Sequence, residues 1–556
     1  MASSMLFPRI TLPLRRNFSV GWFFTITIIT LVVISPLIVV LQFNLHPHTD
    51  TWQHLTDYVL TEYITNSLLL ALGVAIGTFI IGVPAAWLCA LYSFPGKRIL
   101  EVLLLLPLAI PAYIAAYTYT GILDFSGPVQ SYIRETFDWG YGEYWFPEIR
   151  SLGGAIAMFS FALYPYVFLL TRSTLITQSS SIIDAARSLG ANNIERLFSI
   201  IIPLARPAIA AGVTLALMET LADYGTVQYF GVDTFTTGIF RTWFGFGEAV
   251  TAAQLSSILM VTVFALFLLE QRQRKRIRYH NPSNATHKGR EIPLHGSHAI
   301  FAIIACILPS LFGFIIPVLQ LSDWAIDTAS TMVDQQFWSL AFNSFFLAAC
   351  AALATLVIAT ILAYGKRTSK NFLLNSLINL SAMGYAVPGT IIAVGTLIIF
   401  STMDSWLIEF LDHQFDIKAE LIFTGTIFAL VFAHTVRFLS LGLQTVGASL
   451  SKINHSIDEA SQLLGSNLYT TLRSIHLPLI RSGLLTAALL VFVEVMKELP
   501  ATLIMRPFNF NTLAVRTYEL ASDERLADAS TAALAIVLTG IIPVILLNIS
   551  IKANAR

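Results

Sequence analysis

Charged residues are scarce in this chain of 556 residues. They make up 12% of the sequence, whereas a soluble domain carries about 25%. Hydrophobic residues make up 55%, and the mean hydropathy is +0.71. Apolar runs of about 20 residues recur, which is long enough to cross roughly 30 Å of hydrocarbon as helices. Because helices satisfy their own backbone hydrogen bonds in lipid, the composition excludes an ordinary soluble protein and predicts an all-α polytopic membrane protein.

Two further absences narrow the function. The three cysteines, Cys89, Cys306 and Cys350, lie in apolar runs at unrelated spacings, so the sequence suggests neither a disulfide framework nor a CxxC site. No GxxxxGK[ST] phosphate loop occurs, because the Gly-Lys pairs at residues 96–97 and 365–366 are each followed by Arg. We therefore expect no catalytic residues, no enzyme activity and no cofactor bound by this chain.

The hydrophobic runs predict about twelve membrane spans. They lie near residues 22–41, 64–92, 99–123, 152–172, 203–221, 251–270, 299–320, 343–365, 374–400, 419–443, 479–497 and 529–551. Lys and Arg are absent from residues 42–63, whereas a basic run occupies residues 271–278 next to a span. The positive-inside rule then predicts that both termini are cytoplasmic. We interpret the basic run as a topology signal facing anionic lipid, and we expect no nucleic-acid partner.

One segment occurs twice. DAARSLGANNIERLFSIIIPL (residues 184–204) returns 275 residues later as EASQLLGSNLYTTLRSIHLPL (residues 459–479). The same offset pairs Glu219 with Glu494 and Asp223 with Glu498. The repeat divides the twelve spans into two halves of six. Because six is an even number, both halves insert with the same orientation and can be related by a pseudo-two-fold axis along the membrane normal, so the chain is predicted to be a fused dimer.

The repeated segment resembles the cytoplasmic EAA loop of permease subunits of binding-protein-dependent ABC importers. In that family the loop docks on a cytoplasmic ATPase, and Gly permits the turn that follows the docking helix. Asp184 is shorter than the usual Glu, and Ser461 replaces the second Ala, so docking strength is expected to differ between the halves. The matched residues predicted to couple to the ATPase are Asp184, Ala185, Ala186, Gly190, Pro203, Glu459, Ala460, Ser461, Gly465 and Pro478.

Residues 219–243 and 491–519 look like the fused permease of ferric-iron ABC importers. This resemblance implies the type I importer fold, a bacterial inner-membrane location, a periplasmic substrate-binding protein and a separate ATPase in two copies that uses ATP. The predicted domains are an N-terminal segment with the first span (1–61), a first permease domain (62–270), a cytoplasmic basic linker (271–298), the seventh span and its outer loop (299–338) and a second permease domain (339–550).

Glu219 and Glu494, which lie within the fifth span of each half, and their polar neighbours are candidates for the transport pathway. An ionised carboxylate within a bilayer costs about 2.5 to 3.5 kcal/mol unless it faces protein or water. The candidate set is Glu219, Asp223, Tyr224, Glu494, Lys497 and Glu498. A purely structural role is the alternative, because Lys497 follows Glu494 by three residues and is predicted to pair with it on one helix face.

Carboxylate and tyrosine oxygens suit a hard cation such as Fe(III). They do not specify a metal site, and His46, His48 and His54 are interpreted as ordinary loop residues. Iron(III) import is the predicted function. Thiamine, phosphonate or another small solute is the alternative within this family. An ion-driven secondary transporter is the alternative from another class, although it would have no use for two ATPase-docking loops.

Overall fold

The computed structural model describes residues 20–47, 49–140, 142–177, 197–279, 292–369 and 371–554. Within these residues, ten helices are long and apolar enough to cross a membrane, and two helix pairs meet the same criteria when each is taken as one bent span. The prediction of about twelve helical spans is therefore confirmed.

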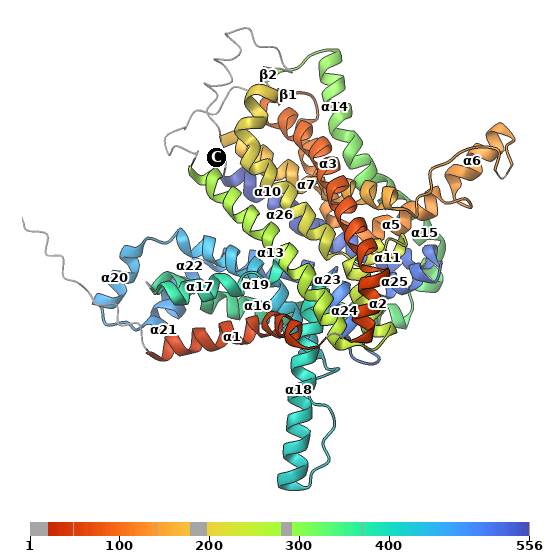
Figure 1. The fold of residues 1–556 in the computed structure, drawn as a ribbon. Helices are drawn as coiled ribbons and strands as arrows, with labels where there is room; N and C mark the ends of the chain where they lie inside the picture. Colours follow the sequence, from red (N-terminus) through yellow and green to blue (C-terminus); the bar gives the residue numbers. More distant parts are fainter. Residues whose placement is uncertain are drawn as a thin grey trace, which may run out of the picture.

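The first half consists of long helices joined by shorter helical elements (Figure 1). Its long helices are α1 (Val20–Gln42), α3 (Leu60–Leu91), α7 (Leu152–Thr177), α10 (Ile202–Ala222) and α13 (Ala249–Tyr279). Shorter elements connect them: η1 (Phe43–Leu45), α2 (Asp50–Tyr58), α4 (Lys97–Leu103), η2 (Leu106–Ala109), α5 (Ala112–Leu123), α6 (Pro128–Phe137), η3 (Leu197–Ile201), α11 (Gly225–Tyr229), α12 (Phe235–Phe240) and η4 (Arg241–Gly245).

The second half repeats this order. Its long helices are α14 (Ser297–Ser310) continued by η5 (Leu311–Ile315) and α15 (Ile316–Met332), then α16 (Gln335–Thr368), α18 (Gly389–Phe415), α19 (Ile427–Ser451), α23 (Arg481–Met496) and α26 (Leu526–Asn554). The shorter ones are α17 (Phe372–Ser381), η6 (Gly384–Ala386), α20 (His455–Leu463), α21 (Leu468–Thr471), η7 (Leu472–His476), α22 (Leu477–Leu479), α24 (Pro500–Met505) and α25 (Leu513–Ser522). Strands β1 (Tyr92–Ser93) and β2 (Ile292–Pro293) form one short parallel pair.

Two of the predicted spans are interrupted by breaks in the helix. The 99–123 span bends by 95° between the helices that meet at Pro111, and the 374–400 span is interrupted before Pro388. The residues before these prolines, Ile110 and Val387, are extended (ψ 119° and 130°). A proline ring disfavours helical geometry in the residue before it and removes a backbone donor. Each of these two predicted spans is therefore made of shorter helices joined at a break.

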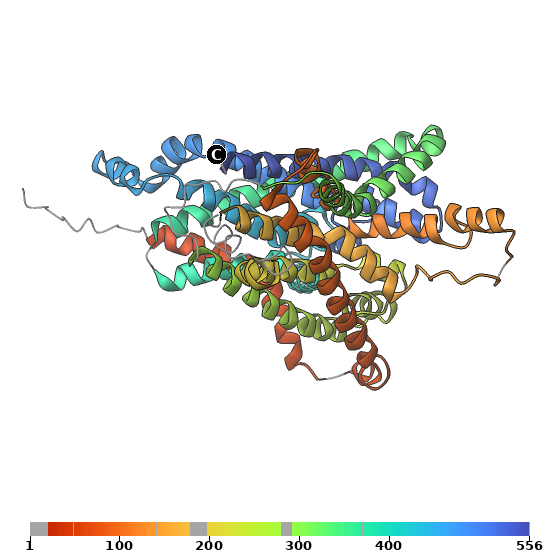
Figure 2. The ribbon, with the colours of Figure 1, turned by 90° about the horizontal axis from the view of Figure 1, so that it is seen from above.

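The first span of each half packs on the opposite half. Helix α1 lies against α17, α18 and α16, whereas α14 lies against α3 and α4. Helix α15, which continues α14, packs mainly on α26 of its own half and also touches α5. Figures 1 and 2 both show α1 within the bundle formed by the second half. At Gly395 of α18 a Cβ atom would lie 2.3 Å from the carbonyl oxygen of Pro36, so only glycine permits this close approach of α1 and α18. The exchange ties the two halves into one body.

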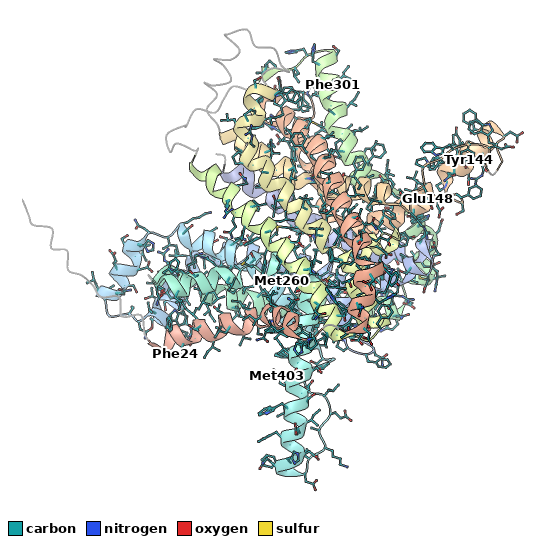
Figure 3. The ribbon with its side chains drawn as sticks, in the orientation of Figure 1. Phe24, Tyr144, Glu148, Met260, Phe301 and Met403 are labelled. Carbon is teal, nitrogen blue, oxygen red and sulfur yellow. The ribbon has the colours of Figure 1, made fainter. Side chains whose placement is uncertain are left out.

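The outward faces of these first spans are apolar. Phe24 of α1 and Phe301 of α14 are 58% and 69% exposed, whereas Met260 of α13 is fully buried near the centre (Figure 3). Apolar surface of this kind is what the hydrocarbon of a bilayer covers.

Two arms project from the body, namely α6 and the C-terminal part of α18 (Figure 1). Residues 416–426 run back along α18, where the fully buried Asp404 accepts hydrogen bonds from the backbone N–H groups of Ile422, Phe423 and Thr424 (3.0, 2.9 and 2.8 Å). Three donors on one carboxylate fix the return segment to the helix.

Candidate functional site

A cavity of about 120 Å³ lies where the two halves meet. The ends of α10 and α23, the start of α5, and side chains from α7 and α19 line it. Five of the six predicted pathway residues, Glu219, Asp223, Glu494, Lys497 and Glu498, lie on its wall. The sixth, Tyr224, stacks on Phe240 instead, with ring centroids 3.6 Å apart, and is not part of the lining.

Asp223 and Glu498 occupy matching positions at helix breaks. Asp223 Oδ1 accepts a hydrogen bond from the backbone N–H of Thr226 at 2.8 Å, at the start of α11. Glu498 accepts from the backbone N–H groups of Ala501 (2.8 Å) and Thr502 (3.0 Å) at the start of α24. Each carboxylate therefore caps the short helix that follows, where free N–H groups and the helix dipole favour negative charge.

The predicted pairing of Glu494 with Lys497 is confirmed, since Lys497 Nζ lies 2.9 Å from Glu494 Oε1. Glu498 has a cation that the sequence reasoning missed. Arg437 of α19 donates to Glu498 Oε1 at 2.6 Å, and the buried His434 lies 4.0 Å from Oε2. An arginine inside an apolar run was the available signal, because intramembrane cations mark functional or paired positions.

Glu219 has a different partner. The hydroxyl of Tyr385, in η6 of the second half, donates a hydrogen bond to Glu219 Oε1 at 2.9 Å. This bond crosses the interface between the halves and was not predicted. It ties the acid of the first half directly to the second half at the cavity wall.

Of the two predicted coupling loops, only the second lies wholly within the described residues. Asp184, Ala185, Ala186 and Gly190 lie outside them. In the second copy, Glu459 and Ala460 are exposed on α20, as are Leu463 (74%) and Leu464 (86%) next to them. Ser461 points inward, and its hydroxyl lies 2.8 Å from that of Thr471. The motif therefore presents a mixed acidic and apolar outer face at one end of the molecule (Figure 1).

Gly465 makes the turn after α20. Its φ is +82°, and no atom lies within 4 Å of where a Cβ would be placed. The N–H of Ser466 bonds to the carbonyl of Ser461 (3.1 Å), and that of Gly465 bonds to Gln462 (2.9 Å). This is a Schellman motif, which requires a left-handed residue at the Gly465 position and strongly favours glycine there.

Pro203 and Pro478 occupy matching places after a wide helical turn. They lie near the starts of α10 and α22, directly after the π-helical turns η3 and η7. A proline lacks the N–H that would continue the ladder, and the wider turn accommodates its ring.

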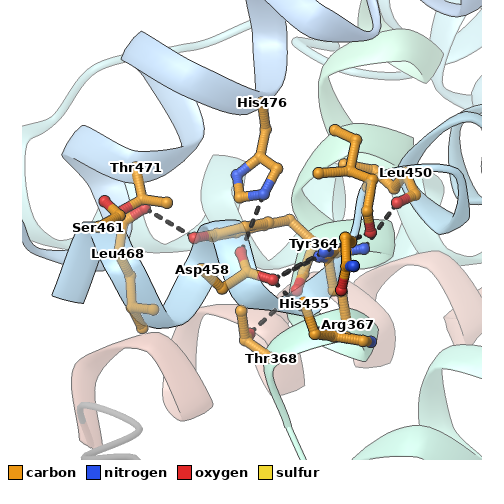
Figure 4. Close-up of polar contacts among 12 residues, drawn as sticks. Tyr364, Arg367, Thr368, Leu450, His455, Asp458, Ser461, Leu468, Thr471 and His476 are labelled. Carbon is orange, nitrogen blue, oxygen red and sulfur yellow. Dashed lines mark hydrogen bonds and ion pairs between the residues drawn. The ribbon is translucent and has the colours of Figure 1, made fainter. Parts of the chain in front are cut away.

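The residue that fixes α20 is Asp458, which immediately precedes the predicted motif (Figure 4). Its Oδ2 accepts from Arg367 Nη2 (2.7 Å) and Nε (3.1 Å), and its Oδ1 lies 2.9 Å from His476 Nε2. Arg367 also donates to the carbonyls of Leu450 (2.6 Å) and Ile453 (2.9 Å). One buried carboxylate thus links α20 to α16, to the end of α19 and to η7.

Within the described residues, no three His, Cys, Asp or Glu side chains are grouped so that they could hold a metal ion. The thiols of Cys89 and Cys306, which the sequence treated as unrelated, lie 3.9 Å apart and are both free.

Comparison with known proteins agrees with this architecture. Residues 82–279 match the family model of the binding-protein-dependent transport system inner membrane component. Within these residues the chain is similar to permease components of binding-protein-dependent transport systems. The chain is 28% identical to the Fe(3+)-transport system permease protein FbpB 2 of Haemophilus influenzae over 495 residues, which are 88% of this chain and 90% of that protein.

Two other relatives show how far the similarity extends. The putative ferric transport system permease protein FbpB 1 of Haemophilus influenzae is 26% identical over 81% of this chain and 71% of its own length. The sulfate transport system permease protein CysT of Salmonella typhimurium is 27% identical, but over only 36% of this chain and 70% of its own. The chain therefore resembles the ferric proteins across both halves and the sulfate protein over little more than one third of its length.

Proposed function

We propose that this permease is the membrane subunit of an ABC importer for iron(III). The observation that carries the proposal is the cavity between the halves, whose wall holds four carboxylates but only two cationic side chains. Oxygen donors with excess negative charge suit a hard cation, and they disfavour an anion such as sulfate. The ferric relatives, which match most of the chain, support the same substrate.

ATP-driven transport is supported by α20. Its exposed Glu459, Ala460 and Leu463 form a surface outside the helix bundle, and the anchor at Asp458 connects that surface to three membrane elements. We infer that a cytoplasmic ATPase, in two copies, docks here and on the matching loop of the first half. A substrate-binding protein then delivers iron at the opposite end, where arm α6 projects (Figures 1 and 2). Both termini lie on the ATPase side of a bacterial inner membrane.

Uptake of radiolabelled iron(III) by cells or proteoliposomes containing the whole importer tests this function. Iron accumulation that requires ATP and is not displaced by thiamine, phosphonate or sulfate is the expected result. Preferential uptake of one of those solutes would replace iron as the substrate. Uptake driven by an ion gradient without ATP would place the protein in the secondary-transporter class instead.

A further inference from the structure

The acidic residues of the cavity wall occur at matching positions in both halves, whereas its cationic residues occur in only one half. The repeat pairs Glu219 with Glu494 and Asp223 with Glu498, and all four acids line the cavity. The same 275-residue offset pairs Arg437 with Ala162 and Lys497 with Ala222, and these four residues also line it. Both cations of the wall therefore come from the second half, where the first half has alanine.

Each acid of the second half is neutralised by its own cation. Lys497 Nζ lies 2.9 Å from Glu494, and Arg437 donates to Glu498 at 2.6 Å. By contrast, among the residues that the structure describes, Glu219 and Asp223 have no Lys or Arg nitrogen within the 4.0 Å of an ion pair. Their partners are neutral: the Tyr385 hydroxyl for Glu219 and a backbone N–H for Asp223. Both ion pairs of the cavity wall thus lie in the second half, and the two acids of the first half make none.

A third oxygen on the same side has no partner. Tyr113 of α5 lines the cavity, is 5% exposed, and its hydroxyl makes no hydrogen bond within the described part of the chain. In this earlier part of each half the repeat offset is 277 residues, which pairs Pro111 with Pro388 and Tyr113 with Thr390. Thr390 is not part of the lining. A buried hydroxyl without a partner is costly unless a ligand satisfies it.

We propose that the transported cation is held from one side of the cavity, by the carboxylates of Glu219 and Asp223 together with the Tyr113 hydroxyl oxygen. Glu494 and Glu498 do not bind it, because their charges are offset by Lys497 and Arg437. The proposal rests on the proposed iron(III) function and adds that two acids related by the repeat have different roles. A hard cation is suited to three oxygen ligands with two negative charges.

The first test compares matched variants in the complete importer, with labelled iron(III) uptake divided by the amount of permease in the membrane. Glu219→Gln removes one unpaired negative charge and should lower uptake at least about tenfold, the effect of losing roughly 1.4 kcal/mol of binding. The control, Glu494→Gln combined with Lys497→Met, removes a neutral pair and should leave uptake within about threefold of wild type.

The second test moves the charge pattern between the halves. Ala222→Lys places an ammonium three residues after Glu219, as Lys497 follows Glu494, and should suppress uptake at least about tenfold without lowering membrane abundance. Adding Lys497→Ala to Glu219→Gln leaves Glu494 unpaired and should recover uptake at least about threefold over Glu219→Gln alone.

The outcomes separate the two proposals. A wild-type importer that takes up no iron(III) refutes the proposed function and, with it, the one-sided site. Wild-type uptake together with equal losses in Glu219→Gln and in the Glu494→Gln, Lys497→Met pair refutes the one-sided site alone. If Ala222→Lys leaves uptake unchanged, the one-sided site is likewise refuted.

Discussion

Replacing Asp458 with Asn should loosen α20 from the membrane helices. The side chains of Asp458 and Arg367 are only 5% and 6% exposed, and their ion pair is 2.7 Å long. Removing one partner of a buried ion pair costs about 3 to 5 kcal/mol. Arg367 keeps its two carbonyl acceptors, Leu450 and Ile453, so we expect the lower end of that range.

A loss of about 3 kcal/mol corresponds to roughly a 100-fold rise in the population with α20 released. Hydrogen exchange of the α20 amides measures this population directly, without reference to transport. In the assembled importer, the same variant should hydrolyse ATP with less stimulation by loaded binding protein, because docking on α20 would no longer move α16 and α19.

Glu459→Gln is the matched control, because Glu459 is the adjacent acid on α20 but is exposed. It should leave exchange in α20 unchanged. Replacing both partners of the ion pair with apolar residues, as in Asp458→Leu with Arg367→Met, should restore the amount of permease in the membrane. It should not restore the stimulation of ATP hydrolysis by loaded binding protein. If Asp458→Asn exchanges its α20 amides at the wild-type rate, the ion pair does not anchor the helix and the reasoning is refuted.

The remaining predictions concern a turn, a membrane ion pair and a helix contact. Gly465→Leu forces a side chain into the left-handed region at a cost of about 1 to 2 kcal/mol; the ATPase should co-purify less with this variant, whereas Gly465→Asn should retain more of it, and equal recovery would count against the turn. Glu494→Gln alone leaves Lys497 unpaired and should lower membrane abundance, which Lys497→Met should restore; an abundance defect that persists in the double variant would contradict the pairing. Gly395→Val would bring a side chain against the Pro36 backbone and should reduce the amount of folded, detergent-resistant protein seen on gels. A normal amount of folded protein would show that α1 can shift away from α18.

Local features of the chain were predictable from the sequence. Long apolar runs must form helices in lipid, so the spans and their repeat followed from composition and period. The Glu494 and Lys497 pair also followed, because residues three apart on one helix are neighbours. The turn at Gly465 was predictable for the same reason, since the requirement for a left-handed residue is local.

The contacts that complete the sites join distant parts of the chain. Arg437 is 61 residues from Glu498, Arg367 is 91 residues from Asp458, and Tyr385 is 166 residues from Glu219. Periodicity says which side of a helix is apolar, but it does not say which other helix covers that side. The breaks at Pro111 and Pro388 change the direction of the chain within predicted spans. Helix α1 packs on the second half and α14 on the first, which brings the two halves together.

The sequence by itself determined an all-helical membrane protein made of two similar halves, because lipid demands helices and a repeated pattern repeats its fold. Only the tertiary structure decided that Glu219 and Glu494 have different surroundings. Their equivalence in sequence is a property of the chain, whereas their charge balance depends on which helices meet at the cavity. Packing between the halves placed Tyr385 on Glu219 and Arg437 on Glu498, so two repeated segments with matching acids acquired different electrostatic environments.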